Sequence, residues 1–417
     1  MKVGVIGLGY VGLPLAVAFA EAAAEVVGVD VDSRTVDSLA RGESTIEDIP
    51  SERLAPLVGE RFTVTTDAAA IAECDAVVIC VPTPLAHQRE PDLSYVDAAG
   101  ESVSENLRAG QLVVLESTSY PGTTRERLGP ILEEGSGLVA GEDFHLAFSP
   151  ERIDPGRTDF TVRTTPKVVG GLTEACCVAA KDLYSLICDE VVTVGTPEVA
   201  ELSKLLENIF RSVNIALVNE LAILADRMGI DVWEVIDAAS TKPFGFMRFE
   251  PGPGMGGHCL PIDPFYLAFK AREYDFPTEF IELAGRVNQA QPQFCVDRAL
   301  RALNDVGKPA RGSRILLLGV SYKAGIGDMR ESPALKIAAM LSDLGADVSY
   351  HDPHVPEIAE LGLRSVELEE GLGACDLAVV VTAHDEIDPQ VVVAQAQRVL
   401  DLRGATRGIE ADHVVRL

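Results

Sequence analysis

The feature that most constrains this chain is a glycine-rich turn near its N-terminus, set between an apolar strand and an Ala-rich helix. The strand covers residues 3–6, the helix begins at about Leu13, and a second strand over 26–29 ends at Asp30. The turn itself reads Gly7-Leu8-Gly9-Tyr10-Val11-Gly12. In this setting the first glycine makes a tight turn, the second lets backbone approach a pyrophosphate, and the third packs helix on strand. The unit therefore predicts a dinucleotide site rather than a ligand-free turn.

Asp30 indicates which dinucleotide is bound. It follows Gly12 by 18 residues and ends the second strand, where a carboxylate can bond the ribose hydroxyls. The same carboxylate would repel a 2′-phosphate. The pyrophosphate would sit at the helix N-terminus, where free N–H groups and the helix dipole favour anions. The predicted cofactor is therefore NAD rather than NADP.

The remaining apolar runs predict two α/β domains around a long helix. Short runs over 76–81, 112–116, 145–148 and 191–194 alternate with helical segments, a pattern typical of a parallel doubly wound sheet. Thr196 is a suitable N-cap and Pro197 a suitable first residue for a helix that meets no Gly or Pro before Gly229. That helix would have about 32 residues and a length of roughly 48 Å.

A second α/β section follows near Arg311. It has predicted strands over 314–319, 347–350 and 377–382, and a helix over 333–344, without a second GxGxxG turn. The predicted fold class is therefore α/β, with two Rossmann-like doubly wound domains joined by the long central helix. We expect an NAD-binding domain over 1–195, a central helical domain over 196–305 and a further Rossmann-like domain over 310–417. A second predicted helix covers about 277–303. The long helix predicts a homodimer or a higher homo-oligomer.

Charge and cysteine usage exclude several classes of partner. The chain has 64 acidic and 35 basic residues, a formal charge of −29, which argues against nucleic acid or an anionic membrane as a general partner. We see no room for a signal peptide and no stretch of about 18 apolar residues, so we expect a soluble cytoplasmic protein. The eight cysteines are scattered, and no Cys/His cluster has the spacing of metal ligands, so no metal site is expected.

One cysteine differs from the rest in its surroundings. Cys259 lies in a predicted Gly- and Pro-rich loop over 241–264, four residues before Asp263. Glycines there would let backbone approach a ligand, so the thiol is placed like a nucleophile. For His258, which directly precedes Cys259, we expect a hydrogen-bonding or spacer role rather than that of a general base. Lys204 and Asn208 share one face of the long helix, a pattern that by itself is more typical of solvated residues.

Taken together, these motifs resemble the UDP-glucose/GDP-mannose dehydrogenase family over essentially the whole chain. Besides the GxGxxG turn, the resemblance rests on motifs that occur in the family's order: Ser117-Thr118, Ser149-Pro150-Glu151, the helix segment over 201–208, the Cys259 segment over 256–263, Tyr322-Lys323, and the segment over 328–333. Such enzymes oxidise a sugar C6 alcohol to a carboxylate by two hydride transfers to two NAD⁺.

The resemblance implies a catalytic role for six residues. Cys259 would add to the C6 aldehyde and carry a thioester. Lys204 and Asn208 would stabilise the oxyanions at C6, and Asp263 would orient or activate the thiol or its water. Thr118 and Glu151 match positions that hold water and transfer protons.

The resemblance also implies binding residues. The expected NAD-binding set is Gly7, Leu8, Gly9, Tyr10, Val11, Gly12, Asp30, Arg34, Pro82, Thr83, Thr118 and Arg330. The expected set for the UDP-sugar substrate is Glu151, Arg152, Lys204, Asn208, Phe249, Gly254, Gly256, Gly257, Lys323 and Arg403.

Two departures from the family's pattern favour one branch of it. Many relatives have a second Glu four residues after the position of Glu151, where this chain has Pro155, so the carboxylate that serves hydrolysis is left open. Ile262 stands where UDP-glucose enzymes commonly have Lys. Both features resemble enzymes of UDP-N-acetylhexosamines, above all the UDP-N-acetylglucosamine 6-dehydrogenases. UDP-N-acetylmannosamine, UDP-N-acetylgalactosamine and UDP-glucose stay as alternatives.

Two other readings account for less of the sequence. A two-electron dehydrogenase of the 6-phosphogluconate or β-hydroxyacid type shares the first domain and the long helix, but explains neither Cys259 nor the last domain. A regulatory protein that binds NAD without turnover would not need Cys259, Lys204 and Asp263 together.

Overall fold

A computed structural model describes residues 1–46, 48–85, 90–152, 159–257 and 259–417, with the side chains of residues 259–261 outside the described part. The chain forms two compact units. The first comprises Met1–Glu207 and Phe265–Phe276, and the second Asn208–Pro264 and Pro277–Leu417. The chain passes between the units at three points, of which two lie within helices and the third between Phe276 and Pro277.

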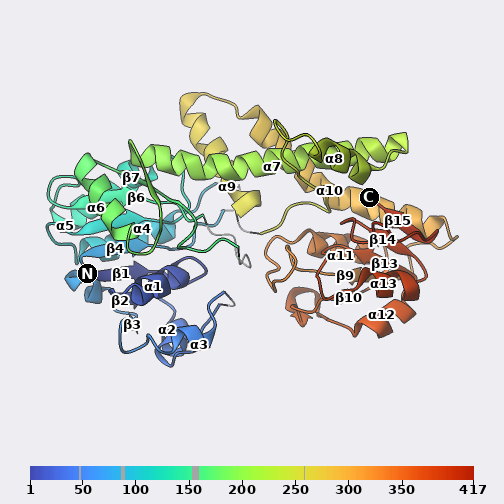
Figure 1. Cartoon of the computed structure of the whole chain (residues 1–417), viewed down its shortest axis with the longest axis horizontal. Coiled ribbons are helices and arrows are strands. Elements are labelled where there is room, and N and C mark those ends of the chain that lie inside the picture. The colour runs from blue at the N-terminus through green and yellow to red at the C-terminus, as the bar shows by residue number, and fades with distance from the viewer. Residues whose placement is uncertain (47, 86–89, 153–158, 258) are drawn as a thin grey trace. The chain divides into compact units, whose positions relative to one another are not determined.

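The first unit is built on an eight-stranded sheet in the order β3-β2-β1-β4-β5-β6-β7-β8 (Figure 1). All neighbours pair in parallel except β6 and β7. The central strands are buried on both faces, as their continuous apolar runs predict. The strands are β1 (Lys2–Ile6), β2 (Glu25–Val29), β3 (Phe62–Thr65), β4 (Ala76–Ile79), β5 (Leu112–Leu115), β6 (His145–Phe148), β7 (Lys167–Gly171) and β8 (Val191–Val194).

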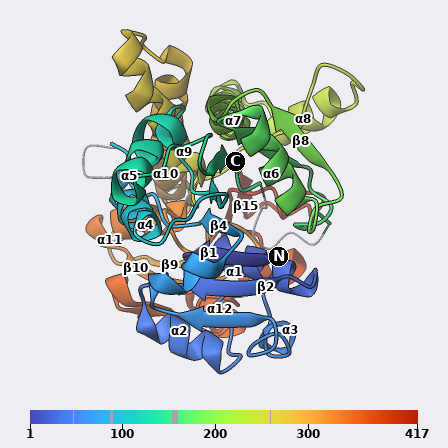
Figure 2. The same ribbon diagram turned by 90° about the vertical axis from the view of Figure 1, so that its left-hand side faces the viewer.

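Helices cover this sheet on both faces. A ring contact of 6.3 Å between Phe19 of α1 and Tyr184 of α6 places these two helices on the same face. Helices α4 and α5 lie together on the side away from α6 (Figure 2). The helical elements of this unit before the long helix are α1 (Gly12–Glu21), α2 (Ser33–Ala40), α3 (Ser51–Leu54), η1 (Ala68–Glu73), α4 (Ser94–Ser104), η2 (Thr123–Leu128), α5 (Gly129–Ser136) and α6 (Glu174–Tyr184).

The second unit contains a five-stranded parallel sheet in the order β10-β9-β13-β14-β15. A short antiparallel pair, β11 with β12, lies beside it. The two-domain α/β fold expected from the sequence is thus confirmed. The strands are β9 (Arg314–Leu318), β10 (Asp347–His351), β11 (Glu357–Ile358), β12 (Leu363–Arg364), β13 (Leu377–Val380), β14 (Val399–Asp401) and β15 (Val414–Arg416).

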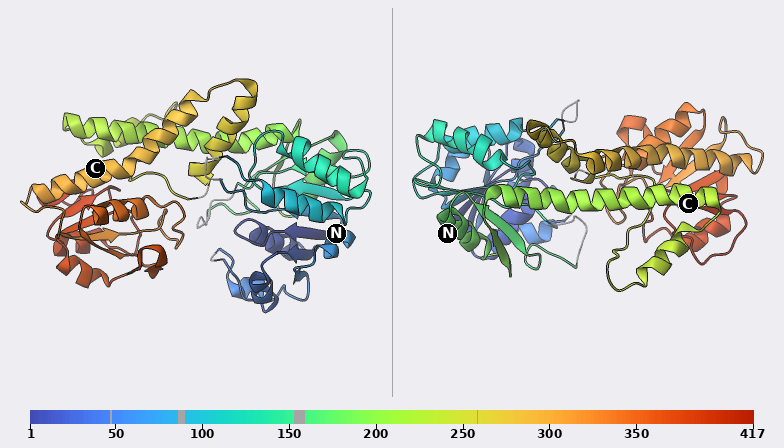
Figure 3. Two further views of the ribbon diagram at one scale, coloured as in Figure 1. Left: turned by 180° about the vertical axis from the view of Figure 1, so that it is seen from behind. Right: turned by 90° about the horizontal axis from the view of Figure 1, so that it is seen from above.

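Helix α10 packs against the second half of the long helix α7 (Figure 3). Buried Asn219 of α7 donates to Asn288 of α10 at 3.0 Å, and apolar residues of both helices join one core with the sheet. The other helical elements of the chain are α7 (Pro197–Met228), α8 (Val232–Ser240), α9 (Cys259–Ala271), η3 (Arg272–Tyr274), α10 (Glu279–Asn304), α11 (Pro333–Asp343), η4 (Ala359–Leu361), α12 (Leu368–Ala374) and α13 (Pro389–Gln395).

Helix α7 has the length that the sequence predicts, 32 residues, but its apolar residues are not all buried. Leu205 and Ile209 are buried, whereas Val199, Leu202 and Leu206 are exposed in the single chain. By length and composition α7 could also cross a membrane, with an 18-residue window of mean hydropathy 1.2, of which 39% is buried. Core helices of soluble proteins pass the same test, and Glu201, Lys204 and Asn208 of α7 make hydrogen bonds to other parts of the chain.

The region around Cys259 differs from the expected loop. The loop was expected to extend to Pro264, but helix α9 begins at Cys259 and runs through Pro264 to Ala271. Two prolines close together favour a loop in a sequence reading. Pro261 lies in the first turn, however, where a missing N–H breaks no bond, so only Pro264 interrupts the helical hydrogen bonds.

Candidate functional site

The glycine-rich turn has the close packing that its spacing predicts. Gly7 has a left-handed φ of +87°, and a Cβ on it would lie 2.7 Å from the carbonyl oxygen of Cys80. A Cβ on Gly12 would lie 1.8 Å from the carbonyl oxygen of Gly7. Around Gly9, by contrast, a Cβ would meet no described atom within 4 Å. The turn is therefore closed toward the sheet and open at Gly9, where a pyrophosphate would approach.

Asp30 holds the turn in shape. One oxygen of its carboxylate accepts from the backbone N–H of Leu8 at 2.8 Å, and the other from that of Asp32 at 2.9 Å. Both bonds fix the carboxylate at the end of β2. It therefore lies beside the turn where ribose hydroxyls are bound in such domains.

The other expected NAD residues of this unit lie in different surroundings. Thr83 is buried, and its carbonyl accepts from the hydroxyl of Tyr266 at 2.7 Å, while Pro82 before it is exposed. The exposed Arg34 pairs with Asp32 at 3.1 Å. The strand order reverses between β1 and β4, and the turns after these strands carry Gly7 and Thr83. Ligands of open α/β sheets bind at such a switch point, so these residues fit a dinucleotide.

An ionic cluster follows β5 and β6 at the same edge of the sheet. Lys204 of α7 donates its ammonium to the backbone carbonyl of Glu151. The Glu151 carboxylate accepts from the N–H of Arg152 at 2.7 Å, and Arg152 pairs with Glu207 at 2.8 Å. Thr118 lies half-buried three residues after β5. The structure thus brings the expected Lys204, Glu151 and Arg152 together.

Lys167 and Glu116 extend this cluster and were not expected from the sequence. The two side chains are buried and form an ion pair, and Lys167 also lies 3.7 Å from the Glu151 carboxylate. Burial lowers the pKa of Lys167 to about 8. Tyr184 donates to the Glu116 carboxylate at 3.2 Å. The sequence feature that could have predicted this pair is Glu116, an acidic residue directly after an apolar strand of a parallel sheet.

Asn208 and Asp263 form a second polar contact. The amide of Asn208 donates to the carboxylate of Asp263, and both side chains are buried. Asp263 lies one turn into α9, which begins at Cys259. The side chain of Cys259 lies outside the described residues, as do His258 and Pro155, so their expected roles stay predictions.

The expected substrate loop packs closely against the segment that carries Lys323. A Cβ on Gly257 would lie 2.9 Å from the ring of Tyr322, and one on Gly256 would lie 2.6 Å from the Cβ of the same tyrosine. The N–H of Gly257 donates to the carbonyl of Arg330 at 2.9 Å. The glycines therefore allow a contact between two backbones that a larger residue would separate.

The rest of that loop has partners in the same unit. The rings of Phe249 and Phe210 meet at 5.8 Å. Gly252 lies against Arg403, whose guanidinium a Cβ on that glycine would approach to 2.4 Å. Burial lowers the pKa of Arg403. A Cβ on Gly254 would meet the Asn288 carbonyl at 3.3 Å. The expected substrate residues Phe249, Gly254, Gly256, Gly257, Lys323 and Arg403 thus all lie in the second unit, where the loop contacts Tyr322 and Arg403.

Arg330 has a local partner. Its guanidinium donates to the carboxylate of Asp328 at 2.6 Å, in the second unit. Its expected contact with NAD stays a prediction.

The second sheet has a switch point of its own, between β9 and β13. The segment with Tyr322 and Lys323 follows β9 at the carboxyl edge of the sheet, where ligands of such sheets bind. A glycine-rich dinucleotide turn in one unit and a second ligand edge in the other fit an NAD-dependent dehydrogenase with two nucleotide-binding domains.

Sequence models of known families identify the family. The NAD binding domain of the UDP-glucose/GDP-mannose dehydrogenase family matches residues 1–188, its central domain residues 198–290 and its UDP binding domain residues 316–408. The chain belongs to this family. The expected family, its NAD cofactor and its class of enzyme, a nucleotide-sugar dehydrogenase, are thereby confirmed.

Curated relatives span nearly the whole chain. A UDP-N-acetyl-D-glucosamine 6-dehydrogenase of Pseudomonas aeruginosa is 36% identical over 394 residues, 93% of this chain and 91% of the relative. A UDP-N-acetyl-D-mannosamine dehydrogenase of Pyrococcus horikoshii is 37% identical over 388 residues, 93% and 90% of the two chains. Among solved structures, UDP-D-ManNAc dehydrogenase from Pyrococcus horikoshii has a TM-score of 0.91 at 33% identity, and covers 100% of this chain and 99% of its own.

Proposed function

We propose that this protein is a UDP-N-acetylhexosamine 6-dehydrogenase, with UDP-N-acetylglucosamine as the first substrate to test. It would oxidise the C6 alcohol to the uronic acid in two steps that remove four electrons. The observation that carries the proposal is the hydrogen bond between the buried side chains of Asn208 and Asp263. Asp263 lies four residues after Cys259, and all three domain models of the family match this chain. A simple alcohol dehydrogenase has no need of a thiol at this position.

The first oxidation needs a hydride acceptor and stabilisation of the oxygen. NAD, held by the turn over residues 7–12 and by Asp30, supplies the acceptor when bound. The C6 hydroxyl proton would pass to a water held by Thr118 and Glu151. Lys204 would stabilise the negative charge at the oxygen, with its ammonium already oriented by the Glu151 carbonyl. The product of this step is the C6 aldehyde.

The second oxidation would pass through a covalent intermediate on Cys259. The thiol sulfur adds to the aldehyde carbon, and the carbonyl oxygen takes up a proton, which gives a thiohemiacetal. Loss of a second hydride and of the hydroxyl proton converts it to a thioester. Water then attacks the thioester carbon, the carbon–sulfur bond breaks, and the acid leaves with the thiol restored. Asn208 and Asp263 would stabilise the oxyanion and orient the thiol or its water.

Two features support an N-acetylated sugar over UDP-glucose. Ile262 replaces the Lys that is common in UDP-glucose enzymes, and Pro155 replaces a second Glu. The matched relatives include dehydrogenases named for UDP-N-acetyl-D-glucosamine, UDP-N-acetyl-D-mannosamine and, in Ralstonia nicotianae, an NDP-N-acetyl-D-galactosaminuronic acid. These names differ in the sugar epimer and agree in the N-acetyl group.

The test is NADH formation with a panel of UDP-sugars, combined with mass spectrometry of the product. We expect two NADH per UDP-N-acetylglucosamine and a product with a C6 carboxylate. Two NADH with UDP-glucose alone would keep the chemistry and exclude the N-acetylhexosamine assignment. One NADH per substrate would favour the two-electron class, and NAD binding without turnover of any sugar would favour a sensor.

Cys259→Ala and Cys259→Ser test the covalent step in the same assay. Neither variant should release the acid at a rate above about a thousandth of the wild type, because no thioester can form. Cys177→Ala is a matched control, since this half-buried thiol lies on α6, where it donates hydrogen bonds to the backbone carbonyls of Val169 and Val194. Full conversion to the acid by Cys259→Ala would exclude the thioester mechanism.

A further inference from the structure

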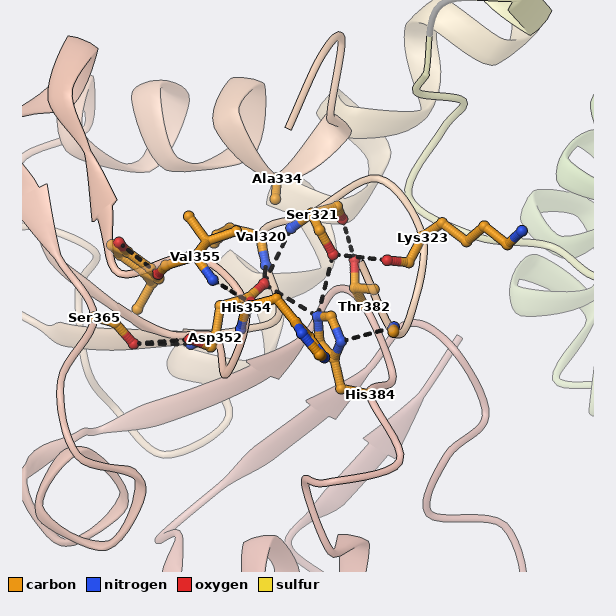
Figure 4. Close-up of polar contacts among 12 residues, drawn as sticks. Val320, Ser321, Lys323, Ala334, Asp352, His354, Val355, Ser365, Thr382 and His384 are labelled. Atoms are coloured by element: carbon orange, nitrogen blue, oxygen red, sulfur yellow. Dashed lines mark hydrogen bonds and ion pairs between the residues drawn. The ribbon is translucent and has the colours of Figure 1, made fainter. Parts of the chain in front are cut away.

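His384 is a buried histidine outside the expected catalytic set, and both of its ring nitrogens have partners (Figure 4). It follows β13 at the carboxyl edge of the second sheet. Its Nδ1 lies 3.2 Å from the backbone nitrogen of Gly325. Its Nε2 lies 3.1 Å from the carboxylate of Asp352 and 3.2 Å from the hydroxyl of Ser321.

These contacts fix the protonation state of the ring. A backbone N–H can only donate, so Nδ1 must accept from Gly325 and carries no proton. The single proton of a neutral imidazole then lies on Nε2, which faces the acceptors Asp352 and Ser321. The Ser321 hydroxyl donates its own hydrogen bond to the carbonyl of Lys323, at 2.8 Å. Only the neutral tautomer with its proton on Nε2 satisfies every one of these contacts.

Asp352 holds the histidine in this orientation. One of its oxygens accepts from the N–H groups of Val320 and Ser321, and the other from those of His354 and Val355, at 2.7–3.1 Å. Burial disfavours the charge of Asp352, but the His384 side chain and these N–H groups outweigh it and lower its pKa to about 2. The residue is therefore a fixed anion that accepts only.

The network is attached to the loop that carries Lys323. Gly325 and Ser321 lie on either side of Lys323, and the Ser321 carbonyl accepts from Thr382 at 2.6 Å. In Figure 4 the Lys323 carbonyl faces the network, while its side chain extends away from it. His384 thus bonds to the loop on both sides of the lysine.

The geometry excludes two other roles for this cluster. In a Ser-His-Asp nucleophile system the serine and the aspartate contact opposite ring nitrogens, whereas here both contact Nε2. The ligand atoms of His354, His384 and Glu386 also lie within 4.8 Å of one another, as in a metal site. A metal ion on His384 would, however, displace either Gly325 or Asp352 from its nitrogen.

We propose that His384 is a positioning residue for nucleotide-sugar binding. Through its Nδ1 it holds the loop at Gly325, and so places Lys323 at the switch point of the second sheet. The inference rests on the proposed function, in which Lys323 is one of the residues expected to hold the UDP-sugar substrate. Loss of His384 would weaken the affinity for UDP and leave the binding of NAD to the first unit unchanged.

Two substitutions distinguish the role of Nδ1 of His384 from that of Nε2. In His384→Asn the side-chain oxygen lies near the former Nδ1 and can still accept from Gly325. In His384→Gln the amide reaches the former Nε2 and cannot. His354→Gln is the matched control, because the centre of that ring lies 5.1 Å from the centre of the His384 ring but its side chain has no described bond to the loop. Each full-length variant is titrated with UDP and with NAD by calorimetry, and exchange of the Gly325 amide is followed by mass spectrometry.

We expect His384→Gln to raise the Kd for UDP about tenfold, the effect of one lost hydrogen bond, with an unchanged Kd for NAD and faster exchange at Gly325. His384→Asn and His354→Gln should stay within about threefold of the wild type. An equal loss in both His384 variants, or unchanged exchange in His384→Gln, would overturn the proposal. Faster exchange at Gly325 in a protein whose wild type binds no UDP would keep the loop contact and overturn the proposed function instead.

Discussion

At the scale of single residues, Asp352 shows how a buried charge can stabilise a ligand edge. Its two oxygens satisfy four backbone N–H groups that would otherwise be buried without an acceptor. Val320 and Ser321 follow the end of β9, and His354 and Val355 follow the end of the neighbouring strand β10. The carboxylate therefore fixes the backbone where the Lys323 loop begins.

The lowered pKa of Asp352 predicts a pH-dependent contribution to stability. With a folded pKa of about 2 against an ordinary value of 3.8, the ionised group contributes about 2 kcal/mol above pH 4. That contribution is lost as the pH falls from about 4 to about 2. Denaturant unfolding of the wild type and of Asp352→Asn should therefore differ by at least this amount at pH 7 and converge near pH 2.

The exposed Asp343, at the end of α11, supplies the control for this experiment. Asp343→Asn should follow the wild type at every pH. A difference between wild type and Asp352→Asn that stayed constant from pH 7 to pH 2 would contradict the assignment of the charge to Asp352.

Residues that belong to a motif could be predicted from the sequence, and residues that only complete a network could not. Asp30 directly follows β2, and Lys204 contacts the carbonyl of Glu151, while the roles expected for these residues stay predictions. Lys167 and His384 were missed because each acts through partners far away in the chain. Glu116 is 51 residues from Lys167, and Asp352 is 32 residues from His384. No local pattern encodes such a contact.

At the scale of elements, α7 is anchored to the first unit by a buried acid. The Glu201 carboxylate accepts from the N–H of Gly122 at 2.6 Å and from the N–H and hydroxyl of Thr124 at 2.9 and 2.7 Å. It thus supplies acceptors for N–H groups at the start of the helical turn η2. Burial outweighs these bonds and raises the pKa of Glu201 to about 7.

This shift predicts that Glu201 makes the protein less stable as the pH rises. Its folded pKa of about 7 lies above the ordinary 4.5, so the folded chain binds the additional proton between these values. The free energy of unfolding should fall as the pH rises from about 4.5 to about 7. Glu201→Gln should remove that slope, as measured by denaturant unfolding across this range. Glu220→Gln, at an exposed position of the same helix, should keep it, and a slope unchanged in Glu201→Gln would refute the assignment.

The predictability of the elements followed the strength of their local signals. Helix α7 has a cap, a proline and an uninterrupted helical stretch, and it begins and ends within a residue of the predicted positions. Strands β3 and β7 were not predicted, because β3 alternates apolar and polar residues and β7 begins with a lysine and ends in two glycines. Helix α9 was taken for a loop because its sequence contains two prolines. Tertiary packing decides such segments.

At the scale of the whole molecule, the exposed apolar residues of α7 support the predicted oligomer. Leu206, Leu217 and Leu224 are 63%, 54% and 51% exposed in the single chain. Repeated large apolar side chains on one helix are typical of a surface that another protein covers. In the predicted homodimer, the α7 helix of a second copy of this chain would cover this surface.

Light scattering tests that prediction. The wild type should have at least twice the chain mass of 44.5 kDa at micromolar concentration. The double variant Leu217→Lys/Leu224→Lys should dissociate, because two buried charges without partners disfavour association. Leu344→Lys changes an exposed leucine outside α7 and should leave the mass unchanged. A monomeric wild type would refute the prediction.

Asp30 also bears on how nucleotide preference can drift or be engineered. Its carboxylate supplies the acceptors for two N–H groups of the turn, besides the place it offers a ribose. A smaller residue that admits a 2′-phosphate would leave the amides of Leu8 and Asp32 without those acceptors. A change of coenzyme by one substitution would thus also loosen the turn that binds either coenzyme. The lineage of this protein would then keep its preference for folding reasons, even where selection on the coenzyme itself was relaxed.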